Sequence, residues 1–239
     1  SERRRLSLYA LISIFAWPSA PVFSQSDAAS NPEGLPNLPR ILEGSPPGEE
    51  PGADIADADA ADTDPLRRAR DALLAAGDHS AALPPAEALV ARPNAASDPH
   101  YPADLIRLGI VHTLLGEFEA AERRYFEAVE RLKSTEGEFS LGLVDAYRAL
   151  GRSYIRERRF LEAITALGEA QHVSQRNLGL FNVDQAGVID DLTTAYLGVG
   201  DVRTAGRLQV ERLDNAVRRF GENDPRIVPY RYGLAAYYE

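Results

Sequence analysis

Apolar side chains recur every three or four residues from residue 64 onward, which is the spacing of amphipathic helices. The pattern is clearest over residues 143–175, where two such helices meet at a short turn. One face of each helix carries the apolar and small residues, which are Leu150, Gly151 and Tyr154 in the first and Ala163, Leu167 and Ala170 in the second. With Phe160 expected where the two helices join, the stretch predicts a helical hairpin.

This pattern repeats on both sides of the hairpin at a fixed step of 42 residues. The periodic series are Leu108, Leu150, Leu192 and Leu234; Gly109, Gly151, Thr193 and Ala235; His112, Tyr154, Tyr196 and Tyr238; and Gly137, Gly179 and Gly221. A single hairpin cannot bury its apolar face, so a constant period indicates an array of stacked hairpins. We expect a degenerate hairpin over residues 64–100, full hairpins over 101–142, 143–184 and 185–226, and a partial one over 227–239.

Small residues and glycines in the repeat have separate predicted roles. The residue after each periodic Leu, such as Gly151, is expected where two helices cross closely. Gly116 and Gly200 are expected to end the first helix of their hairpins in the left-handed conformation. The glycines at 137, 179 and 221 are expected to end the second helices in the same way.

The motif Leu-Gly-x-x-Tyr, followed by Phe and then Ala-x3-Leu-x2-Ala, resembles the tetratricopeptide repeat (TPR). Residues 150–170 carry it, and residues 108–128 carry it with His112 in place of Tyr. The 42-residue period and the segment over residues 218–239 resemble the kinesin-light-chain type of this repeat. The resemblance covers roughly residues 64–239 and implies an all-α, right-handed solenoid of stacked TPR hairpins.

Some positions depart from the motif. The third full repeat has Gln209 and Arg212 where an apolar and a small residue are expected, so we expect its second helix to pack in a shifted register through Leu208, Leu213, Ala216 and Val217. In the degenerate repeat, Gly77 is expected at the turn and Ala82 and Leu89 on the second helix. Pro84 and Pro85 would damage that helix unless they lay in its first turn. The partial repeat should expose its core face, and we expect the full-length chain to continue beyond it.

The N-terminal segment has a different composition. Residues 1–24 combine a basic start, a mostly apolar run over residues 6–17 and small residues, which predicts a secretory signal peptide, or a membrane anchor if it stays uncleaved. The run is shorter than the roughly 20 apolar residues of a membrane span. Residues 25–63 are rich in Pro, Ala and acidic residues, which predicts a disordered acidic linker rather than a docking tail. A periplasmic or secreted location is expected.

The net charge of −10 lies mostly outside the repeats, because residues 24–64 contribute −9 and residues 65–239 only −3. This balance favours neither nucleic-acid binding nor a basic membrane-binding surface. The sequence contains no Cys, which excludes disulfides and thiolate chemistry. Enzyme and nucleotide-binding signatures are absent, and the four His are scattered, with His112 at a core position. We therefore expect no catalytic residues, no metal site and no cofactor.

A row of arginines is the sharpest candidate for a binding site. The first helix of each hairpin should line the concave face of the array. On that face the sequence places Asp145, Arg148, Arg152 and Arg156, together with Arg107 from the preceding repeat and Asp191 and Thr194 from the following one. Because guanidinium groups bind carboxylates through two hydrogen bonds, an acidic peptide or a C-terminal carboxylate could bind there.

An ion-pair ladder between repeats is the alternative interpretation of these arginines. Asp190 lies 42 residues after Arg148, so the two would face each other on neighbouring helices. For the protein as a whole, the sequence predicts a non-enzymatic interaction scaffold with a protein or peptide partner. The alternatives are the regulatory part of a larger enzyme or receptor, and a self-assembling array.

Overall fold

The structure is a computed structural model that describes residues 64–238. The predicted signal peptide over residues 1–24 and the predicted linker over residues 25–63 lie outside the described residues. Residues 64–238 are helical and contain no strand, and none of their helices is long and apolar enough to cross a membrane. The prediction of an all-α repeat fold is confirmed for this part of the chain.

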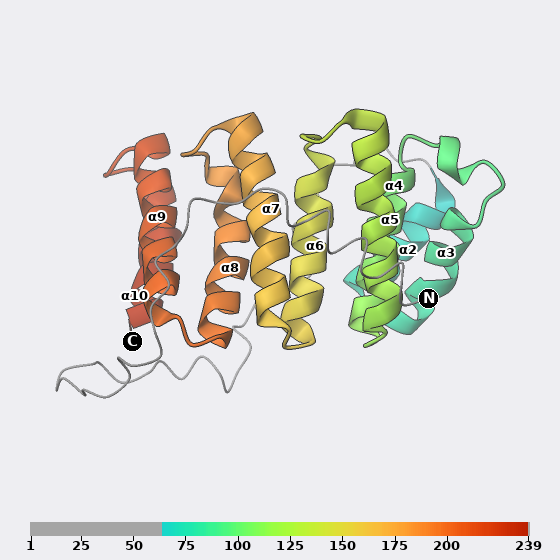
Figure 1. The fold of residues 1–239 in the computed structure, drawn as a ribbon, viewed down its shortest axis with the longest axis horizontal. Coiled ribbons are helices and arrows are strands. Elements are labelled where there is room, and N and C mark those ends of the chain that lie inside the picture. The colour runs from blue at the N-terminus through green and yellow to red at the C-terminus, as the bar shows by residue number, and fades with distance from the viewer. Residues whose placement is uncertain (1–63, 239) are drawn as a thin grey trace. The chain divides into compact units, whose positions relative to one another are not determined.

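The helices form hairpins that follow one another along the chain (Figure 1). The first helices of the hairpins are α2 (Pro65–Ala75), α4 (Tyr101–Leu114), α6 (Gly142–Arg156) and α8 (Ala186–Gly198). Their second helices are α3 (His79–Val90), α5 (Phe118–Glu136), α7 (Phe160–Leu178) and α9 (Val202–Phe220). Helix α10 (Val228–Tyr238) begins a further repeat, and short 3-10 helices at Ala95–Ser97, Val183–Gln185 and Pro225–Ile227 precede α4, α8 and α10. Each helix packs against the next in the chain, and α6 also contacts α4 and α8, which makes the array a solenoid.

Two kinds of glycine end the helices. Gly116 and Gly200 have φ of 78° and 82° and follow the first helices, as predicted. Gly137, Gly179 and Gly221 also have positive φ, but their ψ angles of 172°, 162° and 153° are extended rather than left-handed helical. The expectation that both sets end helices in the same way is therefore wrong. The extended region at positive φ is open to almost no residue but glycine, and it directs the chain away from the helix toward the next hairpin.

The glycines that follow two of the periodic leucines lie at close helix contacts. A Cβ atom on Gly151 would lie 2.5 Å from Cγ of Leu167, and one on Gly109 would lie 2.6 Å from Cε1 of Tyr125. Leu108 and Leu150 are buried next to these contacts. The predicted close approach of the two helices of a hairpin is confirmed. Phe160, in contrast, reaches beyond its own hairpin, because its ring lies where a Cβ on Gly198 of α8 would be.

The third full hairpin keeps its register, so the predicted shift is wrong. Gln209 is buried at the position that Leu167 holds one repeat earlier. Its side-chain amide donates hydrogen bonds to Oγ1 of Thr193 (2.9 Å) and to Oδ1 of Asp190 (3.1 Å). Thr193 stands in place of Gly151, so a polar pair has replaced the Gly–Leu pair. Of the four residues expected in the core, Leu208 and Ala216 are buried, whereas Leu213 and Val217 are only half-buried.

The degenerate N-terminal hairpin is held to its neighbour by buried charges. Arg67 and Arg70 of α2 both donate to the buried carboxylate of Asp104 on α4, at N–O distances of 2.7–3.0 Å. Ala82 and Leu89 are buried on α3, as predicted. Pro84 and Pro85 lie inside α3 rather than in its first turn, so the helix continues despite the two backbone donors that they lack.

Helix α10 exposes positions that are buried in the complete hairpins. Tyr238 is 60% exposed, whereas Tyr154 at the corresponding place in α6 is 6% exposed. This difference confirms the predicted exposure of a core face in the last repeat. The second helix of the hairpin normally covers this face, as α7 does for α6.

Candidate functional site

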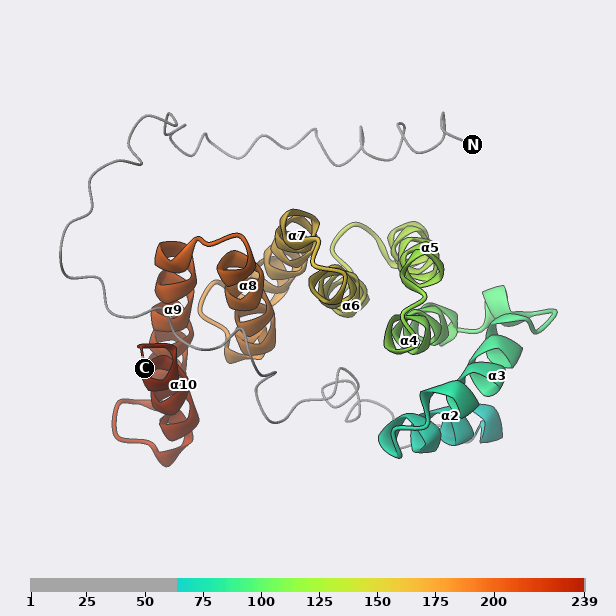
Figure 2. The same ribbon diagram turned by 90° about the horizontal axis from the view of Figure 1, so that it is seen from below.

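The inner side of the array is lined by the first helices of the hairpins. Seen along the helix axes, α4, α6 and α8 follow the inside of an arc, and α5, α7 and α9 lie on its outside (Figure 2). This arrangement follows from hairpins of similar shape that are each rotated slightly against the last. The expectation that the first helices line the concave face is confirmed.

Helix α6 supplies the row of arginines. Arg148, Arg152 and Arg156 are spaced by four residues, which places them on one face of a helix with 3.6 residues per turn. Arg148 and Arg152 are half-buried, whereas Arg156 at the end of the helix is exposed. The exposed guanidinium of Arg156 is therefore the most accessible of the three.

Asp191 on α8 connects this row to the next repeat. Nε of Arg148 donates to Oδ2 of Asp191 at 2.7 Å, and Nε of Arg152 lies 3.8 Å from Oδ1. Gly187 makes room for this contact, since a Cβ there would lie 2.4 Å from Nη2 of Arg148. Of the residues predicted for the site, the structure brings these three together as an ion pair between repeats. The ladder interpretation is thus supported for Arg148, with Asp191 as its partner across the repeats.

Asp190, which was expected to be that partner, contacts residues of the second helix of its own hairpin. Its Oδ1 lies 3.0 Å from Nε of Arg212 and accepts the hydrogen bond from Gln209. Adjacent residues of an α-helix point about 100° apart. Asp191 consequently faces back toward α6, while Asp190 faces α9. The two neighbouring carboxylates therefore belong to different contacts, one between repeats and one inside the third repeat.

The remaining predicted residues lie around this ion pair without joining it. Arg107 is half-buried on α4 and acts electrostatically on the carboxyl of Asp145. Thr194 is exposed on α8, and its hydroxyl donates to the backbone oxygen of Asp190. Asp145 is exposed on α6 between these groups.

Two carboxyl groups on this face are harder to ionise than in free solution. Desolvation raises the pKa of Asp191, and the charges of Arg148 and Arg152 oppose that effect without cancelling it. Water reaches Asp145, yet desolvation by the surrounding protein also raises its pKa, against the opposing effect of Arg148 and Arg107. Partial desolvation strengthens the interactions of arginines with any further carboxylate placed here.

An aromatic residue lies in register with the arginine row and was not predicted as part of the site. Tyr232 of α10 is 84 residues after Arg148, two repeat steps, and it is 73% exposed. The sequence contained the signal, because the same periodicity that aligns the core residues also aligns these surface positions. Tyr232 thus occupies in the last repeat the position that Arg148 and Asp190 hold in the two repeats before it.

Other candidates for chemistry have structural explanations. His112 is buried, as predicted, and its Nδ1 is paired with a carboxylate oxygen of Glu117 at 2.6 Å. Among the described residues, no group of His, Asp and Glu has the arrangement of a metal site.

Comparisons with known proteins identify the fold. No family model matches the chain, and no curated protein matches its sequence. The structure of BtubC (BKLC) from P. vanneervenii is similar, with a TM-score of 0.59 and 21% identity over 72% of this chain and 70% of that one. A protein of nearly identical TPR-like repeats from Podosopora anserina, described as a kinesin light chain, has a TM-score of 0.61 at 17% identity, over 80% of this chain and 88% of that one.

The shared feature is the TPR-like fold. At these identities the similarity extends to the helical solenoid and not to individual surface residues. It agrees with the repeat type that the 42-residue period indicated.

Proposed function

We propose that this chain is a protein-interaction scaffold whose inner face binds an acidic segment or a C-terminal carboxylate of a partner protein. The observation that carries the proposal is the row of Arg148, Arg152 and Arg156 along α6, a helix on the inner side of the array. Arginine is suited to this role because its planar guanidinium binds carboxylates in a fixed geometry. The fold supports the proposal, since TPR-like solenoids present extended concave surfaces.

Asp191 has a defined part in this proposal. It holds Arg148 against α8 in the unbound protein, at a distance of 2.7 Å. A partner carboxylate would compete with Asp191 for the same guanidinium groups, and Arg107 and Thr194 would border the bound segment. The arginines would then be paired with a carboxylate both in the free protein and in the complex. Because one ion pair replaces another, the exchange favours specificity over very high affinity.

Fluorescence anisotropy with a labelled hexa-aspartate peptide tests the inner-face proposal. Replacing Arg148, Arg152 and Arg156 with Glu should weaken binding at least tenfold, because three attractive charges become repulsive. The matched control changes three exposed arginines of the outer helices, Arg123, Arg203 and Arg207, to Glu and alters the net charge equally. An equal loss in both variants, with unchanged helicity by circular dichroism, would show that only net charge matters and would contradict the proposal.

We also infer that the chain is exported, on the basis of the basic start and apolar run within residues 1–24. The scaffold would then act in the periplasm or outside the cell. N-terminal sequencing of the chain recovered from the periplasmic fraction should give a start near Gln25. Recovery of the intact chain from the cytoplasm alone would argue against export.

A further inference from the structure

One edge of the array exposes a group of large apolar side chains that the inner-face proposal does not use. The loops between successive hairpins all lie at this edge (Figure 1). Five large side chains there are between 45% and 61% exposed, and together we call them the loop-edge patch: Phe139, Leu141, Leu178, Leu180 and Phe181. Phe139 and Leu141 come from the loop before α6, Leu180 and Phe181 from the loop after α7, and Leu178 is the last residue of α7.

The repeat itself builds and orders this patch. Phe139 and Phe181 are 42 residues apart, and each ring is covered by an arginine from the next second helix. The guanidinium carbon of Arg176 lies 4.8 Å from the ring centre of Phe139, and that of Arg218 lies 4.4 Å from Phe181. Cation–π contacts of this kind hold exposed rings in place, so little conformational freedom remains to be lost on binding.

The patch is connected across its two loops and ends after them. The side-chain amide of Asn177 donates to the backbone oxygen of Phe139 at 2.8 Å, which ties the first loop to the end of α7 beside Leu178. In the loop after α9, Asn223 occupies the position that Phe139 and Phe181 hold in the loops after α5 and α7. The apolar surface is therefore confined to two repeats rather than running along the whole edge.

The size of the patch matches the apolar centre of a dimer interface. Five large side chains, each about half exposed, offer roughly 400–500 Å² of apolar surface. A stable interface buries about 800 Å² on each partner, of which about 65% is apolar in homodimers. The remaining area would come from polar groups at the borders of the patch.

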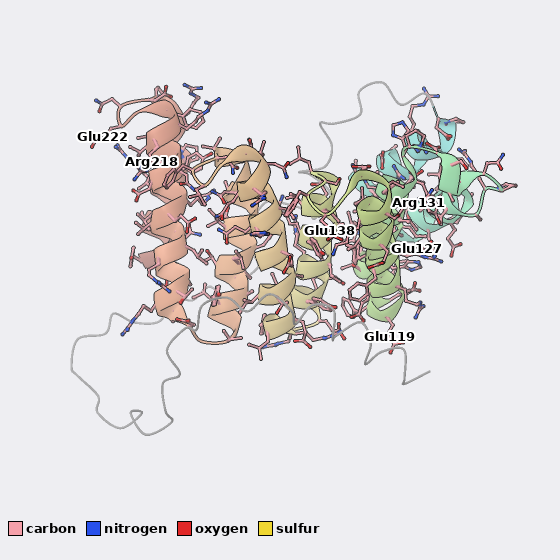
Figure 3. The ribbon with its side chains drawn as sticks, turned by 45° about the horizontal axis from the view of Figure 1, so that its top comes forward. Glu119, Glu127, Arg131, Glu138, Arg218 and Glu222 are labelled. Carbon is pink, nitrogen blue, oxygen red and sulfur yellow. The ribbon has the colours of Figure 1, made fainter. Side chains whose placement is uncertain are left out.

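Those borders carry charges of both signs, and Glu138 lies 3.1 Å from Nζ of Lys133 in its own chain. Along the edge, Figure 3 places Arg131 and then Glu138 on the α5 side, and Arg218 and then Glu222 on the α9 side. A two-fold axis through the patch centre would bring Glu138 of one copy opposite Arg218 of the other, and Arg131 opposite Glu222. Both contacts join opposite charges, whereas an anionic lipid surface would favour a border of one sign.

We propose that a second copy of this chain binds the loop-edge patch about a two-fold axis, with Phe139 and Phe181 at the centre of the interface and Glu138 facing Arg218 at its border. The contact leaves the inner face of the array open in both copies. A dimer would thus present two inner faces for partner binding.

Sedimentation equilibrium of the full chain between 5 and 200 µM tests the proposal. The wild-type chain should sediment with twice the chain mass at the upper concentrations, and Phe139→Ser combined with Phe181→Ser should sediment as a monomer with unchanged helicity. Leu161→Ser is the control, because Leu161 is 69% exposed but lies at the start of α7, outside the patch. It should leave the dimer intact.

Charge reversal tests the two-fold geometry separately from the apolar contact. Glu138→Arg and Arg218→Glu should each raise the dimer dissociation constant at least tenfold in 50 mM salt, and the double variant should restore most of that loss. A monomeric wild-type chain, a dimer that survives the two Phe substitutions, or a double variant no better than the single ones would overturn the proposal. A monomer that floats with phosphatidylglycerol vesicles through Phe139 and Phe181 would assign the patch to a lipid surface instead.

Discussion

At Arg158 the backbone adopts a conformation that glycine holds in the turns before and after it. The residue has φ of 62°, and Gly116 and Gly200, one repeat away on either side, have φ of 78° and 82°. The turn needs this conformation because it ends α6 and starts α7 within three residues. A side chain with a Cβ atom is strained there, so the best-preserved hairpin of the array has the least favourable residue at its turn.

Arg158→Gly should therefore stabilise the array by about 0.5–1 kcal/mol, since relief of the left-handed strain exceeds the added entropy of the unfolded chain. Arg158 is exposed, so little packing is lost. Urea unfolding followed by circular dichroism gives the change in the free energy of unfolding. Arg156→Gly is the matched control: at the last residue of α6, where φ is negative, glycine should not stabilise the chain and should cost a few tenths of a kcal/mol. A loss of stability in Arg158→Gly would mean that its side chain makes a stabilising contact.

At the scale of the helix pair, the spacing between the two helices of a hairpin depends on one small residue. Gly151 and Leu167 meet in the second full hairpin, and Thr193 and Gln209 meet at the same place in the third. The first pair is a close apolar contact, whereas the second pair is joined by a hydrogen bond. The same helix spacing can therefore be kept either by an apolar contact or by a hydrogen bond. For this reason a polar residue at a core position did not shift the register of the helix.

Gly151→Ala tests this steric role and should destabilise by on the order of 1–3 kcal/mol, because the new Cβ would lie 2.5 Å from Cγ of the fully buried Leu167. Gly168→Ala on the facing helix α7 is the control. A Cβ there meets nothing within 4 Å, so the better helix propensity of Ala should stabilise by about 0.5–1 kcal/mol. Thermal melts of the two variants should shift in opposite directions. Shifts of the same sign would contradict the assigned helix contact.

At the scale of the whole described array, periodicity determined what the sequence could predict. Residues that serve every repeat, such as Leu150 and the loop glycines at 137, 179 and 221, recur at 42 residues and were predictable from that step. Residues that serve one contact carry no periodic signal. The contact of Asp191 with Arg148 depends on the rotation of α8 against α6, and a one-residue difference in a helix is about 100° of rotation.

The N-terminal hairpin also contains residues that the 42-residue period could not predict. Its turn glycine, Gly77, lies 39 residues before Gly116, so the 42-residue step does not reach it. Its attachment depends on Arg67, Arg70 and Asp104, and long-range ion pairs between one helix and another have no local sequence pattern. The hairpin was predictable as a degenerate repeat, but the buried charges that hold it were not.

Those buried charges should make the N-terminal hairpin separable from the rest of the array. Asp104 is 3% exposed and accepts hydrogen bonds from both Arg67 and Arg70. Asp104→Ala would leave two buried guanidinium groups without this acceptor, which costs about 3–5 kcal/mol. Because each repeat in a solenoid contacts only its neighbours, the loss should remain local.

Hydrogen exchange measured by mass spectrometry should therefore show faster exchange in α2, α3 and α4 of Asp104→Ala, while α8 and α9 exchange as in the wild-type chain. Asp71→Ala is the control: Asp71 also accepts from Arg70, at 2.8 Å, but its side chain is 45% exposed, so its removal should change exchange little. Faster exchange along the whole array would mean that the repeats unfold as one cooperative unit. An unchanged α2 would mean that apolar contacts between α3 and α4, which bury Ala82 and Val111, suffice to hold the hairpin without the ion pairs.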